Sequence, residues 1–355
     1  MVSGFVEKQG RKWQQVKQAD YYDFYHLPEY VQLDANIIEG EPICWIAETH
    51  AGKVWIPLIK RKIPDSIAKG KEYYDLTSPY GYPGILFERP FTPDMLNAIL
   101  QQYIEDAAEE DFITSFIRMN PLSNPFIWQQ SKLVEQKYHG FTISVPLDKE
   151  LDLIRKDYSS NHRQDIRQLR EQGFKFFLDD MSYYKDFLFI YEQSMDRLDA
   201  SNYYYFSKEY FDKIFEVLGE NVHLAIVTDE RGKEVVAGGL FTDFNGIIQS
   251  HLSATRTSYM EYAPSKLMFD GMIKWAAGSF QKWLHLGGGV NSKEDSLYRF
   301  KKGFSPIKNQ FTTLRIIHDQ QRYNNLNYVA LQENDQTEFD DKDYFPLYRQ
   351  KKVKQ

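Results

Sequence analysis

A run of three glycines is the first sign of a ligand site in this sequence. Gly287, Gly288 and Gly289 follow an apolar stretch and are closely followed by Asn291. Glycine carries no side chain, so its backbone can approach a ligand closely, although glycine also serves tight turns. We therefore predict a strand that ends in a loop whose glycines and Asn291 face a bound ligand.

Lys301 is the strongest candidate for an electrostatic role. It follows Phe300 on a short helix predicted over 297–303, after the glycine loop. A fixed ammonium group at such a place can stabilise an anionic ligand or a developing oxyanion. The alternative is that Lys301 and Lys302 form a solvated pair, as neighbouring charges usually do.

His251 is the candidate proton acceptor. Alternation along a strand places His251, Ser253 and Thr255 on one face of a predicted central strand. Histidine can accept a proton near neutral pH, but a histidine on an apolar strand is also commonly a core residue. Asp295 and Glu294 are weaker alternatives.

Three arginines follow a helical spacing. Arg163, Arg167 and Arg170 are three to four residues apart and therefore share one face of a helix. Such a stripe can bind a diphosphate, or it can pair with acidic residues on a solvated face. Arg163 is nearest to the loop over 158–161, and we expect it to contact substrate.

The segment over 76–84 is rich in proline and glycine, which exclude regular structure. Tyr80 and Tyr82 flank Gly81 within this loop. Aromatic rings stack on the faces of sugars or bases, and tyrosine hydroxyls orient polar groups, so we predict that the three residues line an acceptor site. Packing within the loop is the alternative.

The second half of the chain has a clear order of elements that can position these residues. Helical patterns over 151–172 and 183–198 are followed by three strands over 223–228, 235–241 and 246–253. A helix then begins at Pro264 and a strand leads into the glycines. This order of helices around a three-strand meander matches the GCN5-type acyltransferase fold.

The first half has a vaguer pattern of strands around a helix that begins at Thr92. We predict a mixed α/β protein with two tandem copies of the GCN5-type fold. The expected domains are a degenerate copy over 1–145 and an acyltransferase domain over 146–320. The remaining residues, 321–355, are predicted to be a polar, loosely held tail.

Two segments resemble the Fem family of peptidoglycan-bridge transferases, a branch of the GCN5-related N-acyltransferases. The stronger one is WLHLGGGVNSKEDSLYRFKKGFSP, from Trp283 to Pro306. The second is YSSNHRQDIRQLREQGF, from Tyr158 to Phe174. The loop SPYGYPG and the stretches around Arg197 and Tyr204 are also similar to this group.

The resemblance implies an acyltransferase in which an amine attacks an activated acyl donor. It implies that Lys301 faces the donor, and that Phe300, Arg197 and Tyr204 contact substrate. The chemistry requires a deprotonated amine, a stabilised tetrahedral oxyanion and aligned substrates. The acceptor is then expected to be an amine of a cell-envelope or polysaccharide precursor.

Departures from both patterns keep the donor open. Fem enzymes of peptidoglycan synthesis carry a Pro-Arg-Gly-Pro-like stretch where this chain has YGYPG, and often a coiled-coil arm for which no heptad run exists here. Acetyl-CoA enzymes hold the diphosphate on a loop of small residues, where this chain has Tyr259 and Glu261. Acyl-CoA and aminoacyl-tRNA therefore both remain candidate donors.

Three functions stay open at this point. The first is N-acyl transfer to an amino sugar or similar precursor, and the second is true Fem-type transfer from aminoacyl-tRNA to a peptidoglycan precursor. The third is a catalytically silent ligand-binding module, because a fold can lose its chemistry.

Composition narrows the remaining classes. A net charge of −7 argues against DNA as a partner, since nucleic-acid binding requires many cations. The one cysteine, Cys44, lies in an apolar run, and the sequence contains no zinc pattern, P-loop or membrane-spanning run. We expect a cytoplasmic protein with no metal site and no permanently bound cofactor.

Overall fold

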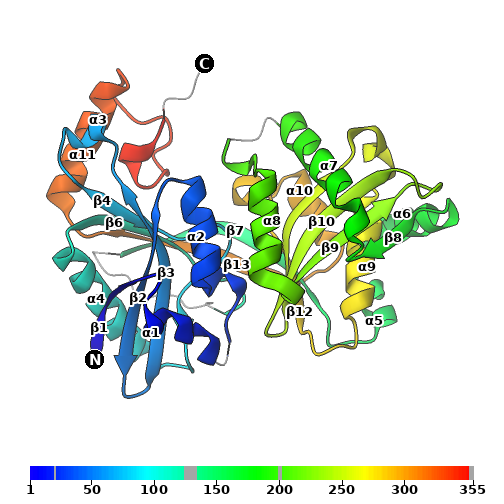
Figure 1. Cartoon of the computed structure of the whole chain (residues 1–355), viewed down its shortest axis with the longest axis horizontal. Helices are drawn as coiled ribbons and strands as arrows, with labels where there is room; N and C mark the ends of the chain where they lie inside the picture. Colours follow the sequence, from blue (N-terminus) through cyan, green and yellow to red (C-terminus); the bar gives the residue numbers. More distant parts are fainter. Residues whose placement is uncertain (20, 124–133, 199–201, 352–355) are drawn as a thin grey trace. The chain divides into compact units, whose positions relative to one another are not determined.

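The computed structural model describes residues 1–19, 21–123, 134–198 and 202–351. The chain forms two compact units (Figure 1). Unit 1 combines Met1–Tyr138 with Phe311–Gln355, and unit 2 is His139–Gln310.

The sheet of unit 1 has the strand order β1-β2-β3-β4-β6-β13. Its strands are β1 (Val2–Glu7), β2 (Glu41–Thr49), β3 (Gly52–Lys62), β4 (Tyr74–Thr77), β6 (Phe112–Arg118) and β13 (Lys308–Ile317), with β5 (Leu86–Phe87) paired to β3. Neighbours are antiparallel except β4 and β6, which run parallel. The helices are α1 (Arg11–Gln14), η1 (Gln15–Gln18), η2 (Phe24–His26), α2 (Pro28–Ile37), α3 (Asp65–Ala68), α4 (Pro93–Glu109), α11 (Gln320–Glu333) and η8 (Leu347–Arg349).

Helix α4 forms as its sequence predicts. The Thr92 hydroxyl accepts the N–H of Met95, and Pro93 occupies the first turn, where its missing N–H costs nothing. Its apolar residues share one face and are buried in the core of unit 1: Leu96, Ile99, Leu100, Tyr103 and Ile104. Burying one such side chain stabilises the fold by about 1.5–3 kcal/mol.

The sheet of unit 2 has the strand order β7-β12-β11-β10-β9-β8. Its strands are β7 (Val134–Pro146), β8 (Lys175–Leu178), β9 (Val222–Thr228), β10 (Val235–Phe244), β11 (Ile247–Thr255) and β12 (Trp283–Gly287). Neighbours are antiparallel except β11 and β12. The helices are α5 (Leu151–Lys156), α6 (Ser160–Glu171), η3 (Met181–Tyr183), α7 (Tyr184–Arg197), η4 (Asn202–Tyr204), α8 (Lys208–Leu218), η5 (Gly219–Asn221), η6 (Thr257–Tyr262), α9 (Ser265–Ala276), η7 (Val290–Ser292) and α10 (Ser296–Lys302).

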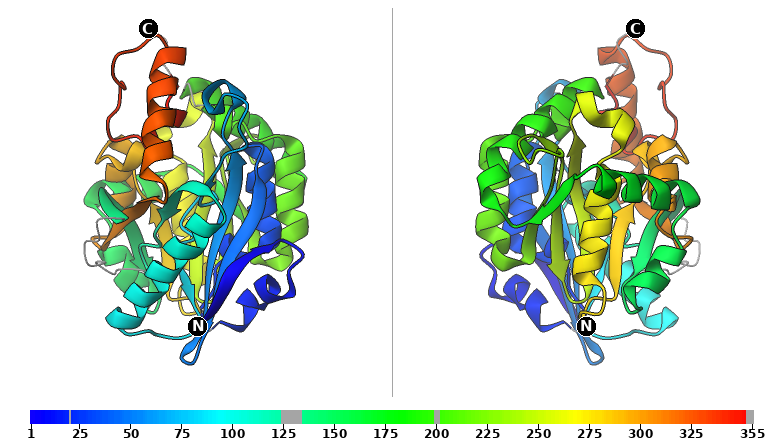
Figure 2. Two further views of the ribbon diagram at one scale, coloured as in Figure 1. Left: turned by 90° about the vertical axis from the view of Figure 1, so that its left-hand side faces the viewer. Right: turned by 90° about the vertical axis from the view of Figure 1, so that its right-hand side faces the viewer.

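Helices cover both faces of this second sheet. A Cβ on Gly238 would meet the ring of Phe187 on α7 at 2.7 Å, and a Cβ on Gly239 would meet Met268 on α9 at 3.2 Å. Successive residues of a strand face opposite sides, so α7 and α9 pack on opposite faces of β10. The right-hand view of Figure 2 shows α9, in yellow, lying over the strands of unit 2.

The strands of the two units follow one topology, which confirms the prediction of two GCN5-type copies. In each, a three-strand antiparallel meander is followed by a helix and by a strand parallel to the last meander strand. A further antiparallel strand then completes the sheet, β13 in unit 1 and β7 in unit 2. The described part of the chain contains no coiled-coil arm.

The predicted boundaries at 145 and 320, and the loosely held tail over 321–355, are corrected by the structure. Strand β13 and helix α11 belong to unit 1. Tyr323, Leu326 and Ala330 of α11 are buried together with Ile113 and Tyr348. The segment is polar in overall composition, although one face of α11 is apolar.

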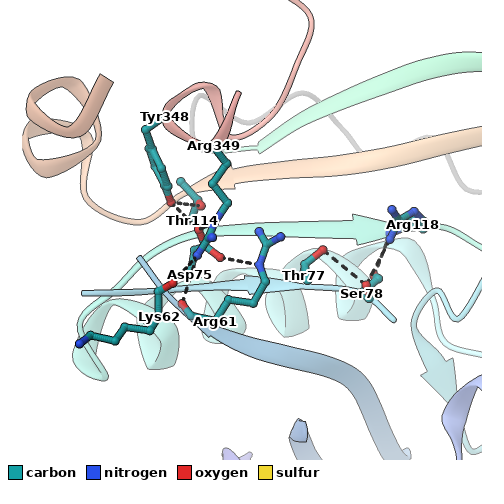
Figure 3. Close-up of polar contacts among 9 residues, drawn as sticks. All are labelled: Arg61, Lys62, Asp75, Thr77, Ser78, Thr114, Arg118, Tyr348 and Arg349. Carbon is teal, nitrogen blue, oxygen red and sulfur yellow. Dashed lines mark hydrogen bonds and ion pairs between the residues drawn. The ribbon is translucent and has the colours of Figure 1, made fainter. Parts of the chain in front are cut away.

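A buried carboxylate ties the C-terminal segment to the sheet of unit 1 (Figure 3). Asp75 on β4 accepts hydrogen bonds from Arg61 Nε at 2.9 Å, Arg349 Nε at 2.5 Å and the Tyr348 hydroxyl at 2.9 Å. Burial raises the pKa of Asp75, but the two guanidinium groups outweigh it and the pKa falls below its usual value. Residues from both chain segments of unit 1 therefore stabilise the charge of Asp75 inside the fold.

Replacing Arg349 with Met should lower the free energy of unfolding by about 3–5 kcal/mol, because Asp75 would lose a cation in a buried site. Urea denaturation measures this. Lys342→Met is the control in the same segment, since Lys342 pairs with Glu338 at 2.9 Å on the exposed surface. Lys342→Met should leave the free energy of unfolding close to the wild-type value, because an exposed ion pair contributes little to stability. Equal small losses in both variants would contradict the structural role of Arg349.

Candidate active site

The strands β11 and β12 pair only at one end. Their three paired positions finish at Gln249 and His285, whereas β11 continues to Thr255. The register between β10 and β11 shifts after Leu240, which leaves His251 on a β-bulge. Bulges are common beside active sites because they redirect side chains and end strand pairing. The ends of β11 and β12 are therefore the part of unit 2 best suited to admit a ligand.

The loop after β12 is held together by Asp295. Its Oδ2 accepts the N–H of Val290 at 2.9 Å, and its Oδ1 accepts the N–H of Tyr298 at 2.8 Å in the first turn of α10. A Cβ on Gly289 would lie 2.4 Å from Asp295 Oδ1, so this position requires glycine. Desolvation raises the pKa of Asp295, but these N–H groups outweigh it and lower the pKa. Asp295 thus stabilises the loop by accepting these hydrogen bonds. This structural role makes Asp295 a less suitable candidate for the base.

Lys301 points from α10 back to the glycine loop. Its Nζ donates a hydrogen bond to the carbonyl of Gly288 at 2.7 Å. Burial lowers the pKa of Lys301 to about 8, although the charge of Asp295 opposes this. Lys301 is half-buried and Lys302 is exposed, so the alternative of a solvated pair is wrong for Lys301. An ammonium group has three N–H donors, so two remain beside the bond to Gly288.

His285 is a site residue that the sequence did not single out. It is buried on β12, and its Nδ1 lies 2.7 Å from Gln249 Oε1 on β11. Burial, together with the nearby charge of Lys301, lowers the pKa of His285 to about 3. A neutral imidazole therefore stands beside the ammonium group. The signal in the sequence was one polar residue within an apolar strand.

His251, the predicted base, is in the environment of a core histidine, and its predicted role stays a prediction. It is buried, and its Nε2 lies 3.3 Å from the hydroxyl of Tyr210 on α8. Burial lowers the pKa of His251 to about 3. A base works best when its pKa is near the working pH, so such an imidazole binds a proton too weakly. The structure favours the alternative of a core histidine.

Phe300 and Asn291 have different environments. Phe300 packs against Phe269 and Phe304, with ring centroids 5.8 and 5.6 Å apart, and so anchors α10 in the core. Asn291 is exposed in η7 and adopts the left-handed conformation, with φ 50°. Both flank the loop that carries Lys301, and their predicted ligand contacts stay predictions.

The connection from β11 to α9 is not built as an anion cradle. Several of its backbone N–H groups are used within the protein: that of Thr257 donates to Gln193 Oε1 at 2.9 Å. Those of Tyr259 and Ala263 donate to backbone carbonyls of the same connection. Glu261 is exposed on it. A diphosphate would find these donors already occupied.

Arg197 lies near this connection, and Tyr204 lies beside Tyr191 of α7. Arg197 Nη1 donates to the carbonyl of Thr255 and to Thr257 Oγ1, both at 3.0 Å. The carbonyl of Tyr204 accepts the hydroxyl of Tyr191 at 2.9 Å. Arg197 therefore fixes the end of β11, and the substrate contacts predicted for both residues stay predictions.

The predicted helix over 151–172 is two helices, and Arg163 joins them. Ser159 caps α6 by accepting the N–H of His162 at 3.2 Å. The exposed Arg163 donates from Nη1 to the carbonyls of Lys156, at 3.2 Å, and Tyr158. One part of its guanidinium thus completes the end of α5, and its predicted substrate contact stays a prediction.

The proline-glycine loop of unit 1 is held in one shape by hydrogen bonds. The N–H of Tyr80 donates to Asp34 Oδ2 at 2.7 Å, and its carbonyl accepts the hydroxyl of Tyr30 at 3.1 Å. The carbonyl of Tyr82 accepts Asn120 Nδ2 at 3.0 Å. These contacts fix the backbone at both tyrosines.

Aromatic packing completes this loop. Gly81 has φ 100°, and a Cβ there would lie 2.1 Å from the ring of Tyr25. The half-buried ring of Tyr82 stands edge-on to Phe311, with centroids 5.2 Å apart. Arg118 donates to the Ser78 carbonyl at the start of the loop (Figure 3). The result is a rigid platform that presents Tyr80 and Tyr82.

The structure brings one group of predicted residues together in unit 2. It consists of the loop and helix with Gly287, Gly288, Gly289, Asn291, Phe300 and Lys301. Tyr80, Gly81 and Tyr82 form a separate group in unit 1. Within the described ranges, no cluster of three or more His, Cys, Asp or Glu side chains could hold a metal ion. No helix in those ranges is long and apolar enough to cross a membrane.

A family model supports the acyltransferase prediction. Residues 156–302 match the acetyltransferase (GNAT) domain, a segment that ends directly after Lys301 and Lys302. No curated protein matches the chain significantly.

Solved structures show the same fold over nearly the whole chain. FemX has a TM-score of 0.63 at 14% identity, covering 91% of this chain and 99% of FemX. L-PGS from Bacillus licheniformis has 0.56 at 10% identity, covering 88% and 93%. A conserved protein of unknown function from Bacteroides thetaiotaomicron has 0.53 at 13% identity, covering 81% and 89%. The chain thus carries a GNAT acyltransferase domain within a Fem-like fold, as predicted.

Asp295→Asn should lower the pKa of Lys301 below about 8, because the charge of Asp295 is what raises that pKa against burial. Asparagine is as good a helix cap as aspartate, so α10 should keep its start. NMR titration of the Lys301 side chain measures the shift. An unchanged or higher pKa in the variant would contradict the electrostatic coupling of the two residues.

Proposed function

We propose that the chain transfers an acyl or aminoacyl group from an activated donor to an amine of a cell-envelope or polysaccharide precursor. The observation that carries this proposal is the half-buried ammonium group of Lys301, held on the Gly288 carbonyl beside the ends of β11 and β12 that do not pair with each other. The GNAT domain over 156–302 supports the reaction class, and the FemX-like fold motivates the class of acceptor.

The reaction needs no group beyond the two substrates and the protein. The acceptor nitrogen attacks the acyl carbon, and a C–N bond forms as the carbonyl oxygen becomes an oxyanion. Collapse of this intermediate breaks the C–S bond of a thioester or the C–O bond of an ester. The proton lost by the amine then balances the charge of the leaving group, directly or through solvent. Lys301 donates hydrogen bonds to the oxyanion, where a positive charge in a desolvated place is most effective.

His285 and His251 have supporting places in this proposal. Their low pKa values, about 3 each, keep both imidazoles neutral at physiological pH. A neutral His285 carries no positive charge, so it does not compete with the Lys301 ammonium group for an anion. The acceptor amine, rather than a histidine, then supplies the lone pair and loses its proton in the reaction.

The connection at η6 bears on the donor. Its occupied N–H groups and exposed Glu261 disfavour the usual diphosphate cradle of acetyl-CoA enzymes. This observation favours the second candidate function, Fem-type transfer from aminoacyl-tRNA to a peptidoglycan precursor. The absence of a coiled-coil arm in the described residues favours an acyl-CoA donor held in another way. Tyr80, Gly81 and Tyr82 are the proposed contacts of the acceptor in either case.

Parallel assays with two labelled donors separate these functions. Acetyl-CoA would be offered with a UDP-linked amino sugar, and lysyl- or alanyl-tRNA with a UDP-linked muramyl pentapeptide. Transfer of label to one acceptor, detected by mass spectrometry, identifies the donor class. Absence of transfer from both donors would favour the silent binding module and contradict the proposed function.

Lys301→Met should reduce kcat/KM by about 30- to 1000-fold, because an oxyanion donor contributes about 2–4 kcal/mol at the transition state. The free energy of unfolding should not fall, since methionine fills the space without a desolvated charge. Lys302→Met changes an exposed neighbour and should retain the wild-type rate. Equal rates in both variants would exclude Lys301 from the transition state.

The pH profile of kcat/KM should fall above about pH 8, where Lys301 loses the proton that it donates. The sign follows from the lowered pKa: the charged form is present below this value and is lost above it. Asp295→Asn should move this descending limb to lower pH, and Lys301→Arg should remove it. A profile that rises through pH 8 in the wild type would instead indicate that the free amine acts as a base.

A further inference from the structure

A hollow of about 300 Å³ lies between α5, α6 and α9 of unit 2. Its wall is mostly apolar, and its charged lining residues are Arg155, Arg163, Arg167, Arg170, Glu171 and Asp270. We call this hollow the arginine pocket. None of its residues belongs to the loop that carries Lys301.

Asp270 holds two guanidinium groups in fixed positions at the pocket. This fully buried carboxylate on α9 accepts bonds from Arg155 Nε and Nη2, both at 2.8 Å, and from Arg170 Nη2. The Tyr158 hydroxyl adds a bond at 3.2 Å. Bonding to Asp270 raises the pKa of Arg155, so its charge is secure. A buried carboxylate requires a paired cation, and here two arginines share one carboxylate.

The lining therefore carries more positive than negative charge. Four arginines face two carboxylates, those of Asp270 and Glu171. Arg167 approaches Glu171 only to 3.8 Å, and both side chains are largely exposed. Each guanidinium has five N–H groups, of which Asp270 takes two from Arg155 and one from Arg170. The other N–H groups of these two arginines are left for solvent or a ligand.

We propose that the arginine pocket binds the phosphate groups of a small phosphorylated ligand. Planar guanidinium groups match phosphate oxygens with paired, charge-assisted hydrogen bonds. Arginines already oriented by Asp270 lose little side-chain freedom on binding. The confined volume and the net charge of −7 on the chain favour a small ligand over an extended polyanion such as RNA. This site goes beyond the proposed function, because binding there requires no acyl transfer.

Calorimetric titration with inorganic pyrophosphate at low ionic strength tests the proposal in the intact protein. The double variant Arg163→Ala/Arg167→Ala removes two exposed cations of the pocket and leaves Asp270 with Arg155 and Arg170. Its Kd should rise at least about tenfold, because charge-assisted bonds to phosphate are lost. Arg167→Ala alone should show a smaller rise, and it serves if the double variant does not fold.

The matched control is Lys208→Ala/Lys213→Ala, which removes two exposed charges from α8 of the same unit. Its Kd should stay within about twofold of the wild type, since distant surface charges are screened. The proposal is overturned if pyrophosphate does not bind the wild type, or if both double variants weaken binding equally. Binding of a single-stranded RNA without any binding of pyrophosphate would also overturn it.

Discussion

Pairing between strands far apart in the sequence is the constraint on which both units depend. Strand β13 comes after all of unit 2, yet it pairs with β6 and buries Leu314 and Ile316 in the core of unit 1. Strand β7 pairs with β12 and buries Ile143 and Val145 in the core of unit 2. An unpaired edge would expose backbone N–H and C=O groups and one side of each core. The core of unit 1 is therefore complete only when β13 has paired with β6, and the core of unit 2 only when β7 has paired with β12.

This constraint also explains which features of the fold the sequence could predict. The helix that begins at Thr92 and the meander of unit 2 depend on neighbouring residues, so their periodicity and turns identify them. The pairing of β13 with β6 joins residues that are far apart in the sequence, so no local sequence pattern predicts it. The same holds for α11, whose buried face became visible only when its packing against Ile113 was known.

Within the candidate site, the residue types predicted the loop and the helix, but they did not predict the pKa values of the ionisable side chains. The glycine run and the Phe300-Lys301 step predicted a loop and helix that the structure contains. The pKa values are set by what covers each group, and spacing carries no information on that. Burial made Lys301 a cation of lowered pKa and His251 a poor base, although both are ionisable residues on apolar elements. His285 was missed because a single polar residue in a strand is usually part of the core.

The strand arrangement determines the order in which the two units can complete their folding during synthesis on the ribosome. Residues Met1–Tyr138 of unit 1 are made before unit 2, but β6 lacks β13 and Asp75 lacks Arg349 until all of unit 2 has been made. All strands of unit 2, in contrast, are available once Gly287 has emerged. Contacts between distant segments form late because closing a long loop costs entropy. Unit 1, whose first segment precedes unit 2 in the chain, therefore completes its folding after unit 2.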